Sequence, residues 1–272
     1  MNKEYIKELH LLYEKAIPYY LSCKSIQQTC NEYNIKTRKS FVEYVKGKGI
    51  DVINYNNQLK CNELAFSEVN SEEVAYWLGL LYADGYINAN RNRLELGLCE
   101  KDVGHIEKFR QFTKCQNKIT YKSNPLGNSC RIGMSSKQLI DDLKRLGCIN
   151  CKSLILKFPN ETQVPKHQIY NFLRGYFDGD GYLGIREIYN WKNEEVVVRP
   201  RCGIVGTYEF IQGYNNALGF EFKDKQLNKK GKAYQYIYSQ EECYLMLDSL
   251  YKNASVYLDR KYDKYRDLMY NK

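Results

Sequence analysis

The sequence predicts an α+β protein made of two similar units in tandem, preceded by a small all-α module. Three observations predict this class. Beyond residue 70, the same order of helix-like and strand-like segments occurs twice. A glycine-containing helix pattern that ends in Asp-Gly occurs at Asp84 and again at Asp180, 96 residues later. Residues 1–60, in contrast, show only the apolar periodicity of helices.

The N-terminal module, residues 1–60, is expected to contain three helices. Its apolar residues recur every three or four positions between Ile6 and Tyr20, as on one face of a helix. Ser25 and Thr37 are expected to cap two shorter helices, which a turn near Asn34 separates.

Two short capped helices around a tight turn resemble a helix-turn-helix, and a plain three-helix bundle is the alternative. Arg38 and Lys39 on the second of these helices are candidate DNA contacts. The polar, Asn-rich residues that follow predict a linker, placed at 61–70.

The first repeated unit spans 71–165 and the second spans 166–272. The first is expected to contain a helix at 71–84, strands at 86–90 and 93–99, a helix at 103–114, strands at 118–122 and 130–134, and a helix at 136–146. The second is expected to contain a helix at 166–180, strands at 182–189 and 196–205, a helix at 208–218, strands at 220–225 and 233–238, and a helix at 240–252. Because this α-β-β-α-β-β-α order does not connect parallel strands through helices, we expect two antiparallel sheets, each covered by helices on one face.

Composition narrows the class of protein. A hydrophobic content of 43% excludes a disordered chain, and a mean hydropathy of −0.61 argues against a membrane-embedded one. A net charge of +9 favours a polyanionic partner, most often nucleic acid. The ten cysteines are scattered, and the pair Cys148 and Cys151 lacks the second pair that structural zinc needs. No secretory signal precedes them, so we expect reduced thiols and an intracellular location: the cytoplasm, the nucleoid or a genome-bearing organelle.

The two helices that end in Asp-Gly carry small residues four positions apart, which form a stripe where another backbone can approach closely. These expected helix-interface residues are Gly79, Ala83, Gly175 and Gly179. Gly85 and Gly181 follow the acids and are expected to end the helices in the left-handed conformation.

The positions of Asp84 and Asp180 need an explanation. A carboxylate in the last turn faces the negative end of the helix dipole, which costs up to about 1 kcal/mol. If the two helices pack together, carboxylates ~4 Å apart also repel by about 1–4 kcal/mol. A bound hard cation would offset both costs, and Mg²⁺ prefers carboxylate, carbonyl and phosphate oxygens.

The strings WLGLLYADG (77–85) and LRGYFDGDG (173–181) resemble the paired motifs of the LAGLIDADG homing endonucleases, and the resemblance covers roughly residues 70–270. It implies a pseudo-twofold monomer whose two motif helices form the central interface. It also implies that two saddle-shaped sheets lie in adjacent major-groove segments of one DNA duplex.

The resemblance implies that Asp84 and Asp180 are the catalytic, metal-binding acids, with backbone carbonyl ligands from Ala83 and Gly179. The implied cofactor is Mg²⁺, with Mn²⁺ as a substitute and Ca²⁺ as an ion that supports binding without cleavage. At the sixth motif position the first copy has Tyr82, where the family has an acid that the second copy keeps as Asp178.

The family commonly places a basic residue near the active site after the last helix of each unit. Lys152 and Lys261 occupy similar places and are candidate catalytic residues, with Arg260 as the alternative for the second. Such a cation stabilises developing charge on phosphate, whereas the simpler interpretation is a solvated surface lysine.

Exposed sheet faces should carry polar side chains at every second position, and arginine and amide side chains there can bond base edges. The candidate DNA contacts are Asn88, Asn90, Arg93, Lys118, Lys122 and Arg131 in the first unit, and Arg186, Lys192, Arg199, Arg201, Lys223, Lys225, Lys229, Lys230, Lys232 and Gln235 in the second.

Together these features predict a site-specific double-stranded DNA endonuclease. It would hydrolyse one phosphodiester in each strand at a long asymmetric target, with Mg²⁺ as cofactor. A non-cleaving DNA-binding regulator or an intron maturase on the same scaffold is the alternative. An intein-embedded nuclease is not expected, because the sequence lacks a splice-junction nucleophile at the start and a terminal His-Asn.

Overall fold

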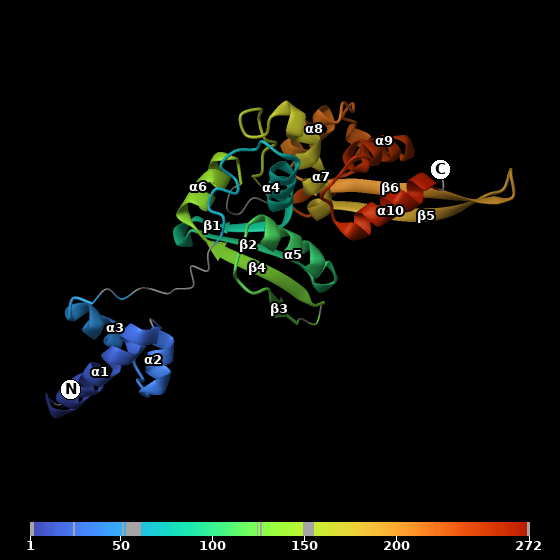
Figure 1. Ribbon diagram of the computed structural model, residues 1–272. Helices are drawn as coiled ribbons and strands as arrows, with labels where there is room; N and C mark the ends of the chain where they lie inside the picture. Colours follow the sequence, from blue (N-terminus) through green and yellow to red (C-terminus); the bar gives the residue numbers. More distant parts are fainter. Residues whose placement is uncertain are drawn as a thin grey trace. The chain divides into compact units, whose positions relative to one another are not determined.

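The computed structural model (Figure 1) describes residues 3–23, 25–50, 52, 61–123, 125, 127–148 and 155–270. The chain divides into two compact units, Met1–Gln58 and Leu59–Lys272. Among the described helices, none combines the length and the apolar character needed to cross a membrane.

The described residues of the N-terminal unit form three helices, α1 (Lys3–Cys23), α2 (Ile26–Glu32) and α3 (Arg38–Gly47). Tyr13, Tyr20 and Phe41 are buried at its centre. The expected caps lie at the expected residues: the Ser25 side chain accepts the Gln28 N–H, and Thr37 is the N-cap of α3 without a side-chain hydrogen bond. These local features are compatible both with a helix-turn-helix and with a plain bundle.

The larger unit has two halves with the same order of elements. The first half contains α4 (Glu72–Asp84), β1 (Gly85–Asn88), β2 (Arg93–Cys99), α5 (Val103–Phe112), β3 (Thr120–Lys122), β4 (Ser129–Ser135) and α6 (Lys137–Arg145). The second half contains α7 (Ile169–Asp180), β5 (Gly181–Asn190), β6 (Glu195–Gly206), α8 (Tyr208–Ala217), β7 (Leu227–Lys230), β8 (Ala233–Ile237), α9 (Gln240–Tyr251) and α10 (Asp259–Tyr270). The strands form two antiparallel four-stranded sheets, ordered β1-β2-β4-β3 and β5-β6-β8-β7. The predicted fold class is confirmed.

Each sheet has a helix-covered face and an open face, because successive side chains alternate along a strand. On the covered face of the first sheet, Leu94 and Leu96 of β2 lie opposite Met134 and Ile132 of β4, and all four are buried. On the covered face of the second sheet, Leu183 lies opposite Cys202 in the same way. The polar residues between these positions lie on the open faces.

The helices α4 and α7 pack side by side at the centre of this unit, where backbone meets backbone (Figure 1). A Cβ on Gly79 would lie 2.9 Å from the Tyr176 nitrogen and even closer to the carbonyl oxygen of Phe172. A Cβ on Gly175 would lie 2.9 Å from the Leu80 nitrogen. The expectation that the glycine stripes form the helix interface is therefore correct.

Gly85 and Gly181 end their helices, but the expected left-handed conformation is wrong. Their φ values of −70° and −86° with ψ values of 140° and 154° are extended. The close packing at these positions explains the glycines instead. A Cβ on Gly85 would lie 2.6 Å from the Leu81 carbonyl oxygen, and one on Gly181 would lie 2.8 Å from the Cε2 atom of Phe177 and closer still to its Cδ2 atom and carbonyl oxygen.

Three other expectations need correction. Residues 61–70 are not a linker, because Ala65, Phe66 and Val69 are buried in the core of the larger unit. The expected strand at 220–225 is wrong, since β7 begins at Leu227. Phe222 packs against Tyr236 from outside the sheet, so its apolar character serves the core without a strand. Helix α10 was not predicted, although its buried residues Lys261, Tyr265 and Leu268 have helical spacing.

Candidate active site and DNA-binding faces

The two acids of the repeated motifs meet at one end of the α4–α7 pair. Asp84 is the last residue of α4, and its Oδ2 atom lies 2.9 Å from the position that a Cβ on Gly179 would occupy. Gly179 also packs against the Ala83 side chain and directly precedes Asp180, the last residue of α7. Only a residue without a side chain at position 179 allows this approach.

Tyr176 and Lys261 lie near enough to both carboxylates to respond to their charges. The pKa of Tyr176 is raised well above its usual value, first by burial and then by the charges of Asp180 and Asp84, among others. The pKa of Lys261 also responds to both carboxylates. The acids therefore lie on one side of the molecule, as the prediction of a shared cation site requires.

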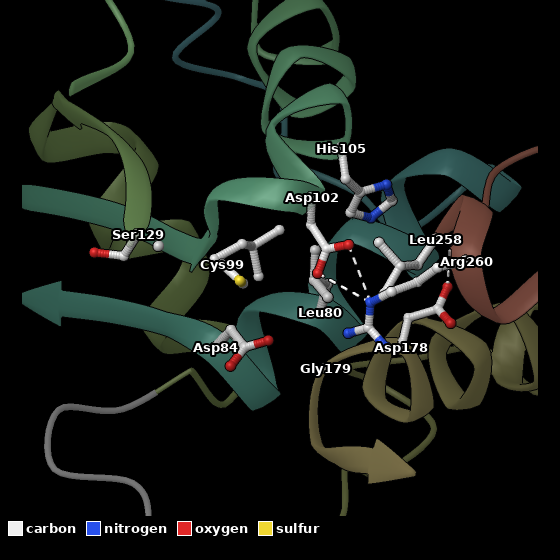
Figure 2. Close-up of a pocket in the computed structure, with 12 residues that line it drawn as sticks. Leu80, Asp84, Cys99, Asp102, His105, Ser129, Asp178, Gly179, Leu258 and Arg260 are labelled. Atoms are coloured by element: carbon white, nitrogen blue, oxygen red, sulfur yellow. Dashed lines mark hydrogen bonds and ion pairs between the residues drawn. The ribbon is translucent and has the colours of Figure 1, made fainter. Parts of the chain in front are cut away.

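A cleft of about 470 Å³ opens next to Asp84 (Figure 2). Its walls come from both halves: Asp102 and His105 from the first, and Gly179, Leu258 and Arg260 from the second. The Nε atom of Arg260 donates to both carboxylate oxygens of Asp102, at 3.0 Å each. This ion pair connects the start of α10 to the first half across the cleft.

Lys261 lies inside the protein and not in the cleft. Its side chain is 2% exposed, and its Nζ atom donates to the backbone carbonyls of Phe177, Asp178 (3.0 Å) and Gly181 (2.6 Å). Burial lowers the pKa of Lys261 to about 8, although the nearby carboxylates oppose this shift. The lysine thus caps the carbonyl end of α7 and positions Asp180, and its predicted role in catalysis stays a prediction.

Of the two cations considered for this place, Arg260 is the one that lines the cleft, and its side chain is 42% exposed. Lys152, the expected counterpart in the first half, lies outside the described residues.

Asp178 is a buried structural acceptor that the sequence did not reveal as such. Its carboxylate accepts the hydroxyl protons of Tyr76 and Tyr251 and the N–H of Leu258. Burial raises the pKa of Asp178. In the first half, Tyr82 occupies the equivalent position and donates to the Leu146 carbonyl. Tyr82 therefore ties α4 to the residue that follows α6, and Asp178 ties α7 to α9 and to the segment between α9 and α10. The departure at Tyr82 does not affect the metal-binding positions.

The donor set fits a hard divalent cation. Asp84 and Asp180 end two helices that pack against each other, and the dipole adds negative potential at these ends. Within the described part of the chain, no three His, Cys, Asp or Glu side chains gather into a metal-binding group. Asp84 and Asp180 would thus supply two carboxylates, with Ala83 and Gly179 carbonyls, water and phosphate oxygens as the remaining candidates. Mg²⁺ is commonly held by one or two carboxylates together with substrate phosphates.

The strand register places part of the expected DNA contacts on the open faces. In the first sheet, the open face includes Asn88, Arg93, Lys122 and Arg131. In the second sheet, it includes Arg186, Arg199, Arg201, Lys230 and Gln235. Asn90, Lys118, Lys192, Lys225 and Lys232 lie outside the strands, in turns and short connections.

Two of the expected contacts, Lys223 and Asn88, have partners within the protein. Lys223 pairs with Glu242 of α9 at 2.9 Å, so its charge is already matched. Lys229 lies opposite Tyr234, on the helix-covered side of the register. The Asn88 side chain accepts the Arg91 N–H and so also caps the turn after β1. Arg38 and Lys39 are exposed in the first turn of α3 in the N-terminal unit.

No family model matches the chain, and no curated protein matches it either. Solved structures similar to it are those of LAGLIDADG homing endonucleases, the family that the two motifs resemble. The meganuclease I-SmaMI bound to uncleavable DNA is 14% identical, with a TM-score of 0.49 over 72% of this chain and 89% of that one. I-LtrWI bound to target DNA is 13% identical, with a TM-score of 0.48 over 74% and 90% of the two chains. I-AabMI bound to uncleaved DNA is 11% identical, with a TM-score of 0.46 over 72% and 91%.

Proposed function

We propose that this chain is a site-specific DNA endonuclease of the LAGLIDADG type that hydrolyses one phosphodiester in each strand. The observation that carries the proposal is the meeting of Asp84 and Asp180 at the ends of two helices in backbone contact. Two duplicated sheets with basic residues on their open faces flank this point, as binding of a long duplex requires.

In this proposal, Asp84 and Asp180 hold Mg²⁺, which supplies Lewis-acid stabilisation of phosphate charge and a lowered pKa of bound water. Lys261 fixes the end of α7 and thereby the position of Asp180. Arg260, held by Asp102 at the edge of the cleft, provides a guanidinium that can bond a phosphate oxygen. The sequence difference between the two halves implies an asymmetric target.

The N-terminal unit is proposed to add flanking contacts to the same duplex through Arg38 and Lys39, which α3 exposes. Both halves of the larger unit belong to one chain, so the proposed active form is a monomer. We further propose that it works in a reducing compartment that contains DNA. The nine cysteines among the described residues are free, which agrees with this location.

The test is cleavage of linear duplex DNA in which cut ends are mapped by sequencing, first from a randomised library and then on the recovered site. We expect double-strand cleavage with Mg²⁺, none with EDTA, and binding without cleavage in Ca²⁺. Asp84→Asn and Asp180→Asn should each abolish double-strand cleavage but leave binding, because the carboxylate charge is lost and the shape is kept. Asp141→Asn on α6, an exposed aspartate paired with Lys137, is the matched control.

Cleavage by both Asp→Asn proteins at the wild-type rate would contradict the assignment. Duplex binding by the wild-type protein without cleavage in any divalent cation would favour the non-cleaving regulator instead. Preference for structured intron RNA over duplex DNA in a gel-shift assay would favour a maturase.

A further inference from the structure

The motif helices α4 and α7, which lie side by side in Figure 1, present equivalent backbone surfaces to each other. Because the motifs are 96 residues apart, adding 96 to a residue number of α4 gives the equivalent residue of α7. A Cβ on Gly79 would lie 2.9 Å from the Tyr176 nitrogen. The equivalent contact is the same, since a Cβ on Gly175 would lie 2.9 Å from the Leu80 nitrogen. The backbone contact would therefore fit two copies of α4, or two copies of α7, as well as it fits the observed pair.

The side chains of this interface are not equivalent, and the sixth motif position shows the difference. The Tyr76 hydroxyl of α4 donates to the Asp178 carboxylate of α7 at 2.7 Å. The residues equivalent to this pair are Phe172 and Tyr82, whose rings contact each other edge to face with centroids 4.9 Å apart. One side of the pseudo-twofold axis thus has a hydrogen bond to a buried acid, and the other side has an aromatic pair.

A second polar pair crosses the same interface. Arg174 of α7, which is 3% exposed, donates to the Glu72 carboxylate at the start of α4 at 2.6 Å. The residues equivalent to this pair, Leu78 and Gln168, carry no charge. Both polar pairs therefore join a buried charged residue of α7 to a polar residue of α4. We call four residues the polar interface pairs: Glu72, Tyr76, Arg174 and Asp178.

Each of the two buried charges also has partners within its own half. Asp178 accepts hydrogen bonds from Tyr251 and Leu258. Arg174 donates to the backbone carbonyls of residues 250 and 256. These bonds do not depend on which helix lies opposite α7, whereas the bonds to Tyr76 and Glu72 do.

A pair of α7 helices from two copies of the chain would lose the bonds to α4. By the pseudo-twofold equivalence, Asp178 would face Phe172, which has no hydrogen-bond donor in its side chain. Arg174 would face the neutral Gln168. Removing one partner of a buried charge is strongly destabilising, because the charge stays out of water without its full set of bonds. A pair of α4 helices alone would leave the buried apolar faces of both α7 helices without a partner.

We propose that the polar interface pairs select the partner of each half. They allow α4 to pair with α7, and they exclude the pairing of like halves between two copies of this chain. Polar residues within apolar helix interfaces select the partner helix in coiled coils by the same principle. The proposal also explains why only one of the two sixth motif positions carries an acid, because acids at both would make the two helices alike.

The selection has a consequence for the target, and this consequence rests on the proposed function. A dimer of like halves would present two identical sheets to a duplex, and a protein with twofold symmetry recognises a palindromic site. Pairing of α4 with α7 keeps two different sheets on one duplex and so keeps the target asymmetric. Residues of the helix interface would thus restrict the class of target site without contacting DNA.

The first measurement is the ratio of dimer to monomer for the full chain, by native mass spectrometry after refolding from urea. The α4 variant, Glu72→Gln/Tyr76→Phe, gives α4 the residues of its equivalents in α7, so both kinds of pairing contain the same contacts. This variant should show a ratio about 100-fold higher than that of the wild type, as expected when the loss of a partner by a buried charge no longer distinguishes the pairings. Dimers that exchange halves but keep α4 with α7 would form in both proteins, so the difference reports the pairing of like halves.

A second variant and a matched control separate selection from a simple weakening of the interface. The α7 variant, Gln168→Glu/Phe172→Tyr, keeps every polar interface pair and gives a second α7 the same partners, so it should also raise the ratio. The control, Glu73→Gln/Tyr82→Phe, makes the same types of substitution on α4 as the α4 variant. Glu73 is exposed and Tyr82 bonds within its own half, so the polar interface pairs remain and the ratio should equal that of the wild type.

The DNA measurement follows from the same proteins. In a binding selection from a randomised duplex library, in Ca²⁺, the wild type should enrich asymmetric sites. The dimers of both variants should also enrich palindromic sites.

The outcomes separate the inference from the proposed function. If both variants show the wild-type ratio, or if the control rises as much as the α4 variant, the polar interface pairs do not select the partner, and the proposed function is unaffected. If the ratios change as expected but none of the proteins binds duplex DNA, the selection stands and the proposed function fails.

Discussion

Replacing Gly175 by alanine tests the central contact between α4 and α7. The glycine lies where the α7 backbone touches that of α4, and the added Cβ would lie 2.9 Å from the Leu80 nitrogen and from the Tyr76 carbonyl carbon. The Tyr76 carbonyl oxygen would be closer still. These are backbone atoms in the middle of a helix, so they cannot rotate away as the end of a side chain could.

The magnitude follows from two opposing effects. Alanine favours the helix over glycine by about 1 kcal/mol. Carbon atoms pack at ~3.5–4.0 Å, so the helices must separate by about 1 Å, and overpacking of this kind costs up to about 3 kcal/mol. The net loss of unfolding free energy is then about 2 kcal/mol. For a unit of this size, that lowers Tm by about 4–8 °C.

The assay combines thermal unfolding with DNA cleavage. A displacement of about 1 Å between the helix ends that carry Asp84 and Asp180 should lower the cleavage rate by about 100-fold, well below the melting temperature. Gly104→Ala in α5 is the matched control, because a Cβ there meets nothing within 4 Å. It should keep the wild-type Tm or raise it slightly. If Gly175→Ala melts and cleaves as the Gly104→Ala protein does, the two helices are not in backbone contact and the proposed site is wrong.

Three further predictions concern buried polar groups. Burial lowers the pKa of His105 to about 3, so below pH 6.5 the unfolded chain takes up a proton that the folded chain does not. Stability should therefore fall by about 2 kcal/mol between pH 6.5 and pH 4.5 through this group, and urea titrations of His105→Gln should show a shallower pH dependence. Equal pH profiles for the two proteins would contradict this. Arg174→Met leaves the Glu72 carboxylate without its 2.6 Å partner and should cost about 3 kcal/mol in the same titrations; an unchanged urea midpoint would show that the pair contributes nothing. Asp178→Asn places an NH₂ group among donors and should cost about 2 kcal/mol, with loss of cleavage as α10 loosens; wild-type stability would refute that role.

Local signals in the sequence were sufficient for most elements. The caps at Ser25 and Thr37 and the alternation in β2 depend on neighbouring residues, which a sequence displays directly. The predictions failed at residues whose environment is set by contacts that the local sequence pattern does not display. Phe66 looked like part of a polar linker but is buried by the core. Gly85 looked like a left-handed stop, yet its reason is the nearby Leu81 carbonyl and side chain.

The residues of the candidate site divide in the same way, into those that a local motif reveals and those whose place depends on tertiary packing. The motif spacing was enough to single out Asp84 and Asp180, because a duplicated pattern of small residues and acids is a local feature of each helix. The opposite placement of two adjacent residues, Lys261 under the end of α7 and Arg260 in the cleft, depends on how α10 packs, and α10 itself was not foreseen.

By itself, the sequence determined the duplicated order of elements, the glycine-notched helices and the acids at their ends, since all of these follow from periodicity and repeats. The tertiary structure alone decided which cations remain available at the surface. Whether a lysine or arginine faces solvent, an acid or a row of carbonyls depends on partners far away in the chain. Desolvation and pairing then set the role of that cation, as they do for Lys223 and Lys261.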